Sequence, residues 1–212
     1  MDIIKEISEH IQTGNATAVA DLTRSAVSAQ IAPKEILDRG LIAGMAVVGE
    51  KFKHHELFLP DVLLAAKAMN AGMNLLKPLL IKEGIPTIGR VVIGTVQGDL
   101  HDIGKNLVSI LLKGAGFEVI DLGNDVAPET FLDTAEREHA AIIGMSALLT
   151  TTMPVMKTVI ERAKERGLYG KKKFIIGGAP LSADYAREIG ADAYCYDGVN
   201  AIDTVKQLLG VT

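Results

Sequence analysis

Cysteine and tryptophan are almost absent from this chain of 212 residues, which has one cysteine, Cys195, and no tryptophan. A single cysteine excludes a disulfide within the chain and any metal cluster that requires several thiolates. It also suits a reducing compartment, so we expect a cytoplasmic protein. Because aromatic residues are scarce, we expect a core built from alanine, leucine, isoleucine and valine.

Long hydrophobic runs and a targeting segment are missing as well. No uninterrupted apolar run approaches the ~20 residues that a membrane span requires. The first six residues lack the basic region and the apolar core of a secretory signal. The formal net charge of -4 argues against nucleic acid as a principal partner, although residues 171–173 form a local basic patch. We therefore expect neither a membrane nor a nucleic acid as a partner.

The first part of the chain carries helical patterns only. Apolar residues recur at three- and four-residue spacing in residues 3–11 and 17–29, and Pro33 suits the first turn of a third helix. Leu59-Pro60-Asp61 opens a fourth helix that extends through Leu76. Four helices with short connections predict a small four-helix bundle.

The pattern changes after residues 84–89, a segment rich in glycine and proline, which predicts a linker. Strand-like runs then occur at about residues 91–96, 118–122, 141–145, 173–177 and 192–195. Helical segments alternate with them and begin near Gly104, Pro128, Thr152, Ala183 and Val199. This alternation predicts a Rossmann-like, flavodoxin-type sheet of five parallel strands. We expect a helical domain at residues 1–84, a linker at 85–90 and an α/β domain at 91–212.

Charged and small residues follow the first predicted strand. Asp99 and His101 lie two residues apart, between Gly98 and Gly104. In a parallel α/β sheet they belong to the loop at the carboxyl end of the strand, where ligands bind. The histidine could ligate a metal, with the aspartate fixing its tautomer and ring direction. Alternatively, the aspartate caps the next helix and the histidine is an ordinary surface residue. This fragment alone leaves both interpretations open.

Two later segments fall at the same end of predicted strands. Ser146-Ala147-Leu148 follows the run at 141–145, and Gly177-Gly178 follows the run that begins at Lys173. The combined pattern is Asp-x-His-x-x-Gly, 41 residues, Ser-x-Leu, 28 residues and Gly-Gly. It resembles the signature of cobalamin-binding domains in which a protein histidine replaces the lower base of the cofactor.

The resemblance implies specific roles around the cofactor. His101 would bind cobalt, Asp99 would accept a hydrogen bond from its other ring nitrogen, and Ser146 would bond Asp99. This relay would take up a proton when the histidine leaves cobalt and release it when the histidine returns. The displaced nucleotide tail of the cofactor would need a slot lined by backbone, although Gly-Gly is also an ordinary strand-to-helix turn. The other residues that the resemblance places at the cofactor are Gly98, Leu100, Asp102, Ile103, Gly104, Leu148, Thr150, Thr152, Gly177, Gly178, Tyr196, Asp197 and Gly198.

Residues 48–62 resemble the helical cap of methionine synthase and of the small corrinoid proteins of methyltransferase systems. The match would place Phe52, Leu59 and Val62 over the upper face of the corrin, although each suits a bundle core equally well. His54 and His55 lack acidic or cysteine partners at ligand spacing, so we interpret them as solvated residues at a helix end.

The resemblance covers nearly the whole chain and implies a methyl carrier without catalysis of its own. Its cofactor would be cobalamin or a related corrinoid, with the methyl group carried on cobalt as in methylcobalamin. One methyltransferase would load the methyl group from a substrate, and a second would pass it to tetrahydrofolate or a thiol such as coenzyme M. A reductive activase would restore oxidised cobalt.

Three alternatives remain at this point. Subunits of radical mutases resemble the sheet domain alone, and cobalamin-sensing regulators normally carry an additional DNA-binding domain. A flavodoxin-like nucleotide or signalling domain would leave His101 and Ser146 without a role.

Overall fold

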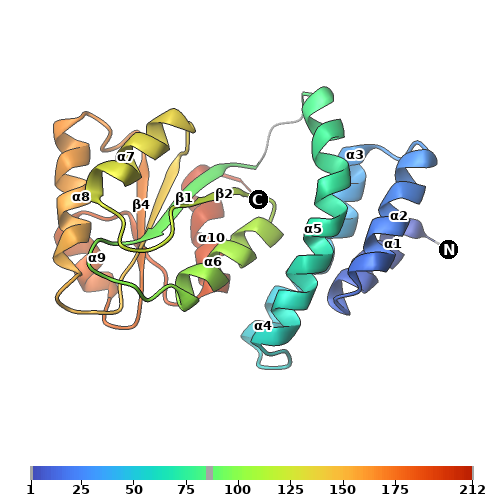
Figure 1. The fold of residues 1–212 in the computed structure, drawn as a ribbon, viewed down its shortest axis with the longest axis horizontal. Coiled ribbons are helices and arrows are strands. Elements are labelled where there is room, and N and C mark those ends of the chain that lie inside the picture. Colours follow the sequence, from blue (N-terminus) through green and yellow to red (C-terminus); the bar gives the residue numbers. More distant parts are fainter. Residues whose placement is uncertain (1, 85–87, 212) are drawn as a thin grey trace. The chain divides into compact units, whose positions relative to one another are not determined.

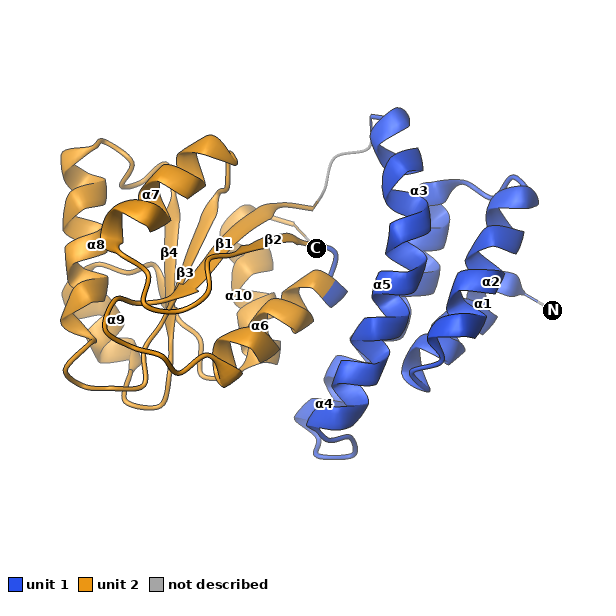
Figure 2. Cartoon of the chain, in the orientation of Figure 1, with its two compact units in different colours: residues 1–87, 114–116 blue, residues 88–113, 117–212 orange. Residues whose placement is uncertain are grey.

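The computed structural model describes residues 2–84 and 88–211. The chain forms two compact units, residues 1–87 with 114–116 and residues 88–113 with 117–212 (Figure 2). The division at residue 87 falls within the segment 85–90 that the sequence predicts as a linker. Residues 85–87 of that segment lie outside the described residues.

The first unit is helical, as predicted (Figure 1). Its elements are α1 (Ile3–Gln12), α2 (Ala16–Ser28), α3 (Pro33–Glu35), the π-helical η1 (Ile36–Ile42), α4 (Ala43–Lys53) and α5 (Leu59–Lys82). Since α3, η1 and α4 follow one another without a break, they form the predicted third helix. The apolar spacing of this third helix did not indicate the π-helical stretch, because such stretches are rare insertions into an α-helical pattern.

Small residues bring the helices of this unit together. A Cβ atom at Gly44 would lie 2.8 Å from Cβ of Ile11, so α4 passes very close to α1. At Gly72 it would lie 3.2 Å from Cγ1 of Val19, so α5 also passes close to α2. The unit is therefore held by close apolar packing between neighbouring helices.

The second unit contains a sheet of five parallel strands in the order β2-β1-β3-β4-β5. The strands are β1 (Arg90–Thr95), β2 (Glu118–Asp121), β3 (Ile142–Ser146), β4 (Lys173–Gly177) and β5 (Ala193–Tyr194). The helices are α6 (Ile103–Gly114), α7 (Pro128–Arg137), α8 (Pro154–Glu165), α9 (Ala183–Ile189) and α10 (Gly198–Leu209). This is the flavodoxin-type order that the sequence predicts, with β1 and β3 at the centre, where the chain changes direction across the sheet.

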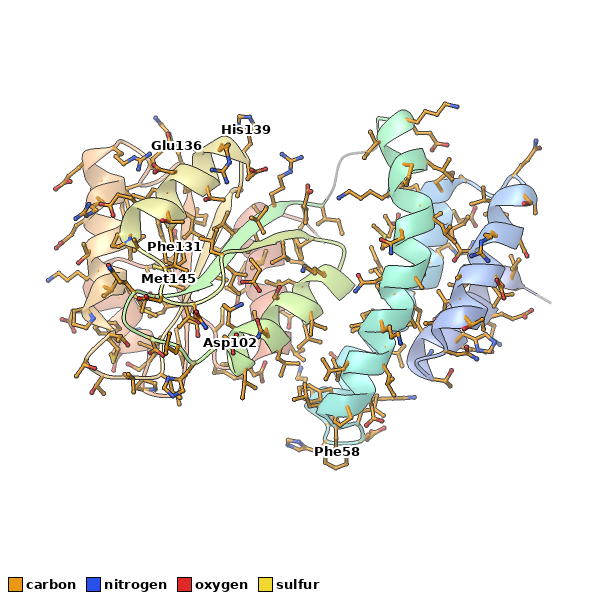
Figure 3. The ribbon with its side chains drawn as sticks, in the orientation of Figure 1. Phe58, Asp102, Phe131, Glu136, His139 and Met145 are labelled. Atoms are coloured by element: carbon orange, nitrogen blue, oxygen red, sulfur yellow. The ribbon has the colours of Figure 1, made fainter. Side chains whose placement is uncertain are left out.

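Helices cover both faces of the sheet, with α7, α8 and α9 on one face and α6 and α10 on the other (Figure 1). Phe131 of α7 and Met145 of β3 belong to the core of the first face and lie inside the unit in Figure 3. On the other face α10 lies directly on α6, because a Cβ atom at Gly198 would overlap Cδ1 of Leu111.

The largest difference from the predicted element starts is at α8, which begins at Pro154 rather than near Thr152. A hydrogen-bonded turn precedes the helix, in which the backbone N–H of Thr152 donates to the carbonyl of Leu149 at 3.1 Å. No helix of the described residues is both long enough and apolar enough to cross a membrane.

Candidate functional site

The three predicted motifs meet at the carboxyl edge of the sheet. In the strand register Thr95 of β1 pairs with Ser146 of β3, and Ser146 pairs with Gly177 of β4. The loops that follow these three strands are therefore neighbours. The sequence separates them by dozens of residues, and parallel pairing brings them to one edge.

The carboxylate of Asp99 is the centre of this edge and is fully buried. Its Oδ1 accepts from the backbone N–H of His101 at 3.0 Å and lies 2.8 Å from Nδ1 of the His101 ring. Its Oδ2 accepts from the backbone N–H groups of Leu148, at 2.8 Å, and Leu149, at 3.1 Å, and from Oγ1 of Thr152 at 2.9 Å. A buried charge is tolerated here because so many donors satisfy it.

These donors also determine the charge of the carboxylate. Burial by itself raises the pKa of Asp99, but hydrogen bonds from the backbone of His101 and Leu148 and from the side chains of His101 and Thr152 outweigh it. The net result is a pKa well below the ordinary value for aspartate. Asp99 is thus an anion across the physiological pH range.

The His101 ring is oriented by this anion. A carboxylate only accepts hydrogen bonds, so Nδ1 carries a proton, and in the neutral ring Nε2 is the nitrogen with the lone pair. The side chain is 52% exposed, and Nε2 has no hydrogen-bond partner within residues 2–84 and 88–211. The carbonyl of His101 accepts from Oγ1 of Thr95 at 3.1 Å, which also fixes the backbone. The arrangement presents one imidazole nitrogen, ready to ligate a metal.

The hydroxyl that bonds Asp99 belongs to Thr152 and not to Ser146. The predicted Ser146–Asp99 hydrogen bond is not found in the described part of the chain. The backbone carbonyl of Ser146 accepts a hydrogen bond from the N–H of Val96 at 3.0 Å. The expectation for Ser146 is corrected in this respect, because the turn before α8 folds Thr152 back over the carboxylate. Thr152, which the resemblance places at the cofactor, is buried beside Asp99.

Position 178 must be glycine because of contacts within the protein, without any contribution from a cofactor. The residue has a φ of 138°, and a Cβ atom there would overlap the carbonyl oxygen of Ala147. At Gly177 a Cβ atom would lie 3.1 Å from the carbonyl of Cys195. A Cβ atom at Gly104, by contrast, would meet nothing within 4 Å. The Gly-Gly pair therefore allows the loops to pack, whereas the space at Gly104 is open.

Large apolar side chains are exposed in the loops at this edge and at the first residue of α6. Ile103 is 76% exposed, and the others are Leu100, Leu148, Leu149 and Tyr196. Exposed apolar residues gathered around a polar centre are typical of a ligand site. Sequence reasoning missed Leu149, which also donates its N–H to Asp99.

The remaining predicted residues have varied surroundings. Asp102 lies half-buried just before α6 (Figure 3), and Thr150 is exposed. Asp197 caps α10, since its Oδ1 accepts from the N–H of Asn200 at 2.7 Å. Gly98 has a φ of 85° and is exposed in the turn before Asp99. Asp197 and Gly198 thus have structural roles at the start of α10 that the sequence reasoning did not assign.

In the helical unit, Phe52 and Leu59 are half-buried and Val62 is fully buried. Phe58 is 68% exposed in the segment between α4 and α5 (Figure 3). His54 is exposed at a helix end, as predicted, but the expectation that it lacks an acidic partner is wrong, because Glu50, four residues earlier on the same helix, lies 3.6 Å away. Among the described residues no group of three or more His, Cys, Asp or Glu side chains could hold a metal ion.

Two family models, each described as a B12 binding domain, match residues 89–206 and residues 3–77. The chain belongs to the family of B12-binding corrinoid proteins. A corrinoid protein of Desulfitobacterium hafniense is 40% identical over 99% of both chains. The dimethylamine corrinoid protein of Methanosarcina barkeri is 43% identical over 98% of both chains. Trimethylamine corrinoid protein 1 of Methanosarcina mazei is 41% identical over 98% of this chain and 97% of that protein.

Solved structures of corrinoid proteins have the same fold. The chain matches a chain of the methanol:cobalamin methyltransferase complex MtaBC from Methanosarcina barkeri with a TM-score of 0.89 and 31% identity. That match covers 100% of this chain and 81% of the other. A cobalamin-binding protein from Desulfitobacterium hafniense matches with a TM-score of 0.78 and 29% identity over 98% of both chains. The predicted fold class, the resemblance to corrinoid proteins and the corrinoid cofactor are confirmed.

Proposed function

We propose that this corrinoid protein carries a methyl group between two methyltransferases. The observation that carries the proposal is the His101 ring, whose Nδ1 is held by the buried Asp99 carboxylate and whose Nε2 is left to ligate. It stands in a chain that is similar to methylamine corrinoid proteins over nearly its full length.

The residues at the edge of the sheet fit a corrinoid. A corrin ring supplies four nitrogen ligands to cobalt, so a further donor from the protein would complete the coordination, and the imidazole of His101 would be a suitable one. The open space at Gly104 and the exposed side chains of Leu100, Ile103 and Leu148 offer backbone and apolar surface to a large, flat ligand. We propose that Gly98, Asp102, Thr150 and Tyr196 contact the cofactor as well.

Each residue has a task that follows from its position. His101 would ligate cobalt through Nε2, and Asp99 would hold the tautomer and raise the basicity of the ring. Thr152, Leu148 and Leu149 keep Asp99 ionised and in place. When bound, the cofactor supplies a cobalt that accepts a methyl group in one partner and releases it in the other. Phe52 and Leu59 would shield the methyl group from water, for which their half-buried apolar side chains are suited, whereas the expected contact of Val62 does not fit its full burial.

The partners follow from this carrier role. One is a substrate:corrinoid methyltransferase, and the similarity to a chain of a methanol:cobalamin methyltransferase complex supports it. The others are a methylcorrinoid:acceptor methyltransferase, acting toward tetrahydrofolate or a thiol such as coenzyme M, and a reductive activase. Relatives named for dimethylamine and for trimethylamine are similar to this chain to nearly the same degree, at 43% and 41% identity, which suits a donor selected by the partner enzyme.

We also propose a cytoplasmic location, for which the single cysteine is the support. The division into a helical cap at 1–84, a linker at 85–90 and a cofactor domain at 91–212 belongs to the same proposal.

The test is reconstitution with methylcobalamin, removal of excess cofactor and photolysis to cobalt(II). Electron paramagnetic resonance is recorded with natural-abundance protein and with protein labelled at histidine with nitrogen-15. We expect stoichiometric binding and a nitrogen hyperfine splitting that changes with the label. In a folded His101→Ala protein, labelling histidine with nitrogen-15 should no longer change the spectrum. His139→Asn is the matched control, because His139 is an exposed histidine of the same unit with a φ of 53° that asparagine tolerates. Binding without histidine coordination, or none at all, would overturn the proposal.

A further inference from the structure

The segment after β2 runs along the loop that carries His101. The N–H of Thr95 donates to the carbonyl of Gly123 at 3.0 Å, and the N–H of Val126 donates to the carbonyl of Thr95 at 3.0 Å. Val96 and Val126 form a further parallel bridge. The pairing between the first two strands therefore continues beyond β2, up to the start of the ligand loop.

Asp125 makes two contacts with that loop. Its Oδ1 accepts from the N–H of Gly98 at 2.7 Å, and its own N–H donates to the carbonyl of Asp99 at 3.0 Å. The neighbouring Asn124 side chain reaches the carbonyl of Leu100 at 3.5 Å. Residues 98–100, directly before His101, are thus held through successive backbone groups by the β2–α7 loop.

The backbone of Asp125 is unusual, with a φ of 52° in the left-handed region. Residues other than glycine adopt this region at a cost, although aspartate and asparagine tolerate it best. A local outlier that is kept by specific hydrogen bonds beside a ligand site is a reason to look for a function. Here the left-handed turn lets the side chain and the main chain of one residue bond the same loop.

A second anchor ties the same segment to α6. The ammonium of Lys105, whose side chain is 2% exposed, contacts both carboxylate oxygens of Asp121 at 2.6 Å. Oδ1 of Asp121 also accepts from the N–H of Gly123 at 2.9 Å. Since Lys105 follows His101 by four residues, the segment holds the ligand loop on both sides of the histidine.

We infer that Asp125 is a positioning residue for the axial histidine. It fixes the backbone of Gly98 and Asp99 from the β2 side, while Leu148, Leu149 and Thr152 fix the Asp99 carboxylate from the β3 side. Together these contacts determine the direction in which the His101 ring is presented. The inference rests on the proposed function of His101 as a cobalt ligand and adds a residue that does not touch the ligand itself.

Three substitutions separate the side-chain acceptor of Asp125 from its left-handed backbone conformation. Asp125→Asn keeps an acceptor oxygen and a residue that tolerates the left-handed region. Asp125→Gly keeps the backbone conformation and removes the acceptor, and Asp125→Ala disturbs both. Asp125 is exposed and lies outside the core, so each variant is expected to fold. Asp203→Ala is the control, because Asp203 is exposed on α10.

Two measurements test the inference. In the protein without cofactor, amide hydrogen exchange at Gly98 should accelerate about tenfold in Asp125→Gly and Asp125→Ala, and less than about twofold in Asp125→Asn. In the protein loaded with cobalt(II) corrinoid, the ratio of histidine-coordinated to uncoordinated cobalt should fall roughly tenfold in the glycine and alanine variants. The asparagine variant should restore the ratio, and the control should match the wild type.

The outcomes separate the inference from the proposed function. If the wild type shows histidine coordination and Asp125→Gly shows the same ratio, Asp125 is not a positioning residue and the proposed function stands. If the wild type binds corrinoid without histidine coordination, the proposed function fails and the inference fails with it. Faster exchange at Gly98 with an unchanged coordination ratio would also overturn the inference, because the contact would then have only a structural role.

Discussion

The helical unit and the α/β unit treat buried polar groups in opposite ways. The buried polar side chains of the described residues are Thr23, Thr95, Asp99, Lys105, Ser109, Thr134 and Thr152. Only Thr23 belongs to the helical unit, and its hydroxyl has no hydrogen-bond partner among the described residues. In the α/β unit, Thr95, Asp99, Lys105 and Thr152 all hydrogen-bond at or beside the ligand edge.

The comparison distinguishes contacts that only stabilise the fold from contacts that also orient the groups of the candidate site. The helical unit is held by apolar packing, which is non-directional and tolerates changes of detail. The ligand edge needs groups in definite directions, and hydrogen bonds to buried charges supply them. Substitutions of buried polar residues in the two units should therefore change the free energy of unfolding by different amounts and in opposite directions.

The largest effect is expected from Asp121→Ala, which leaves the buried ammonium of Lys105 without its carboxylate. We expect a loss of about 3 kcal/mol in the free energy of unfolding, at the lower end for buried pairs because Asp121 is partly exposed. Urea unfolding of the full chain measures it. Adding Lys105→Met to the same chain should restore most of the loss, and a double variant no more stable than Asp121→Ala would contradict this account.

Asp99→Asn should cost about 2 kcal/mol at neutral pH, since it removes the charge from hydrogen bonds to a buried carboxylate. The pKa of Asp99 is lowered in the folded protein, so its contribution is complete above the unfolded value of about 4 and is lost as the pH falls through the folded value. The difference between wild type and variant should stay constant from pH 8 to pH 5 and shrink below about pH 4. Unfolding series at several pH values check it, and a difference that grows toward acid pH would contradict the sign.

Thr152→Val should cost about 1.5 kcal/mol, because it removes one donor to the buried carboxylate while the volume is kept. The pKa of Asp99, followed by nuclear magnetic resonance in the protein without cofactor, should move toward its ordinary value. The matched variant Ser146→Ala should leave that pKa unchanged, since the hydroxyl beside Asp99 is that of Thr152. A larger shift in Ser146→Ala than in Thr152→Val would reverse the assignment.

Thr23→Val is the corresponding change in the helical unit and should have the opposite sign. It replaces a buried hydroxyl without a partner in the described residues by a methyl group of similar size, so we expect a gain of up to about 1 kcal/mol. Thermal unfolding of the full chain measures the shift. Destabilisation equal to that of Thr152→Val would remove the distinction between the two units.

Much of the α/β fold could be predicted from local patterns. Apolar runs followed by glycine or charged residues locate β1, β3 and β4 to within about a residue, because a strand buried on both faces requires a nearly continuous apolar run. The π-helical turn at Ile36–Ile42 escaped prediction, since the apolar spacing of the third helix is compatible with an uninterrupted α-helix.

The candidate site divides in the same way. The contact between Asp99 and His101 joins residues two apart, so the spacing alone indicated it. Thr152 lies 53 residues from Asp99, and Asp125 lies 27 residues from Gly98. Their approach depends on how two loops turn after their strands, for which the strand pattern carries no signal.

By itself, then, the sequence determined the order of the elements, the edge at which the motifs meet and the residue that offers a free imidazole nitrogen. These properties follow from periodicity and from short spacings, which act along the chain. Only the tertiary structure decided that Thr152 rather than Ser146 hydrogen-bonds Asp99 and that Asp125 holds the ligand loop. It also decided that residue 178 must be glycine, because a side chain there would overlap the carbonyl of Ala147. The reason is that hydrogen-bond direction and close packing are settled between loops distant in sequence, and there a shift of about 1 Å decides which donor reaches the carboxylate.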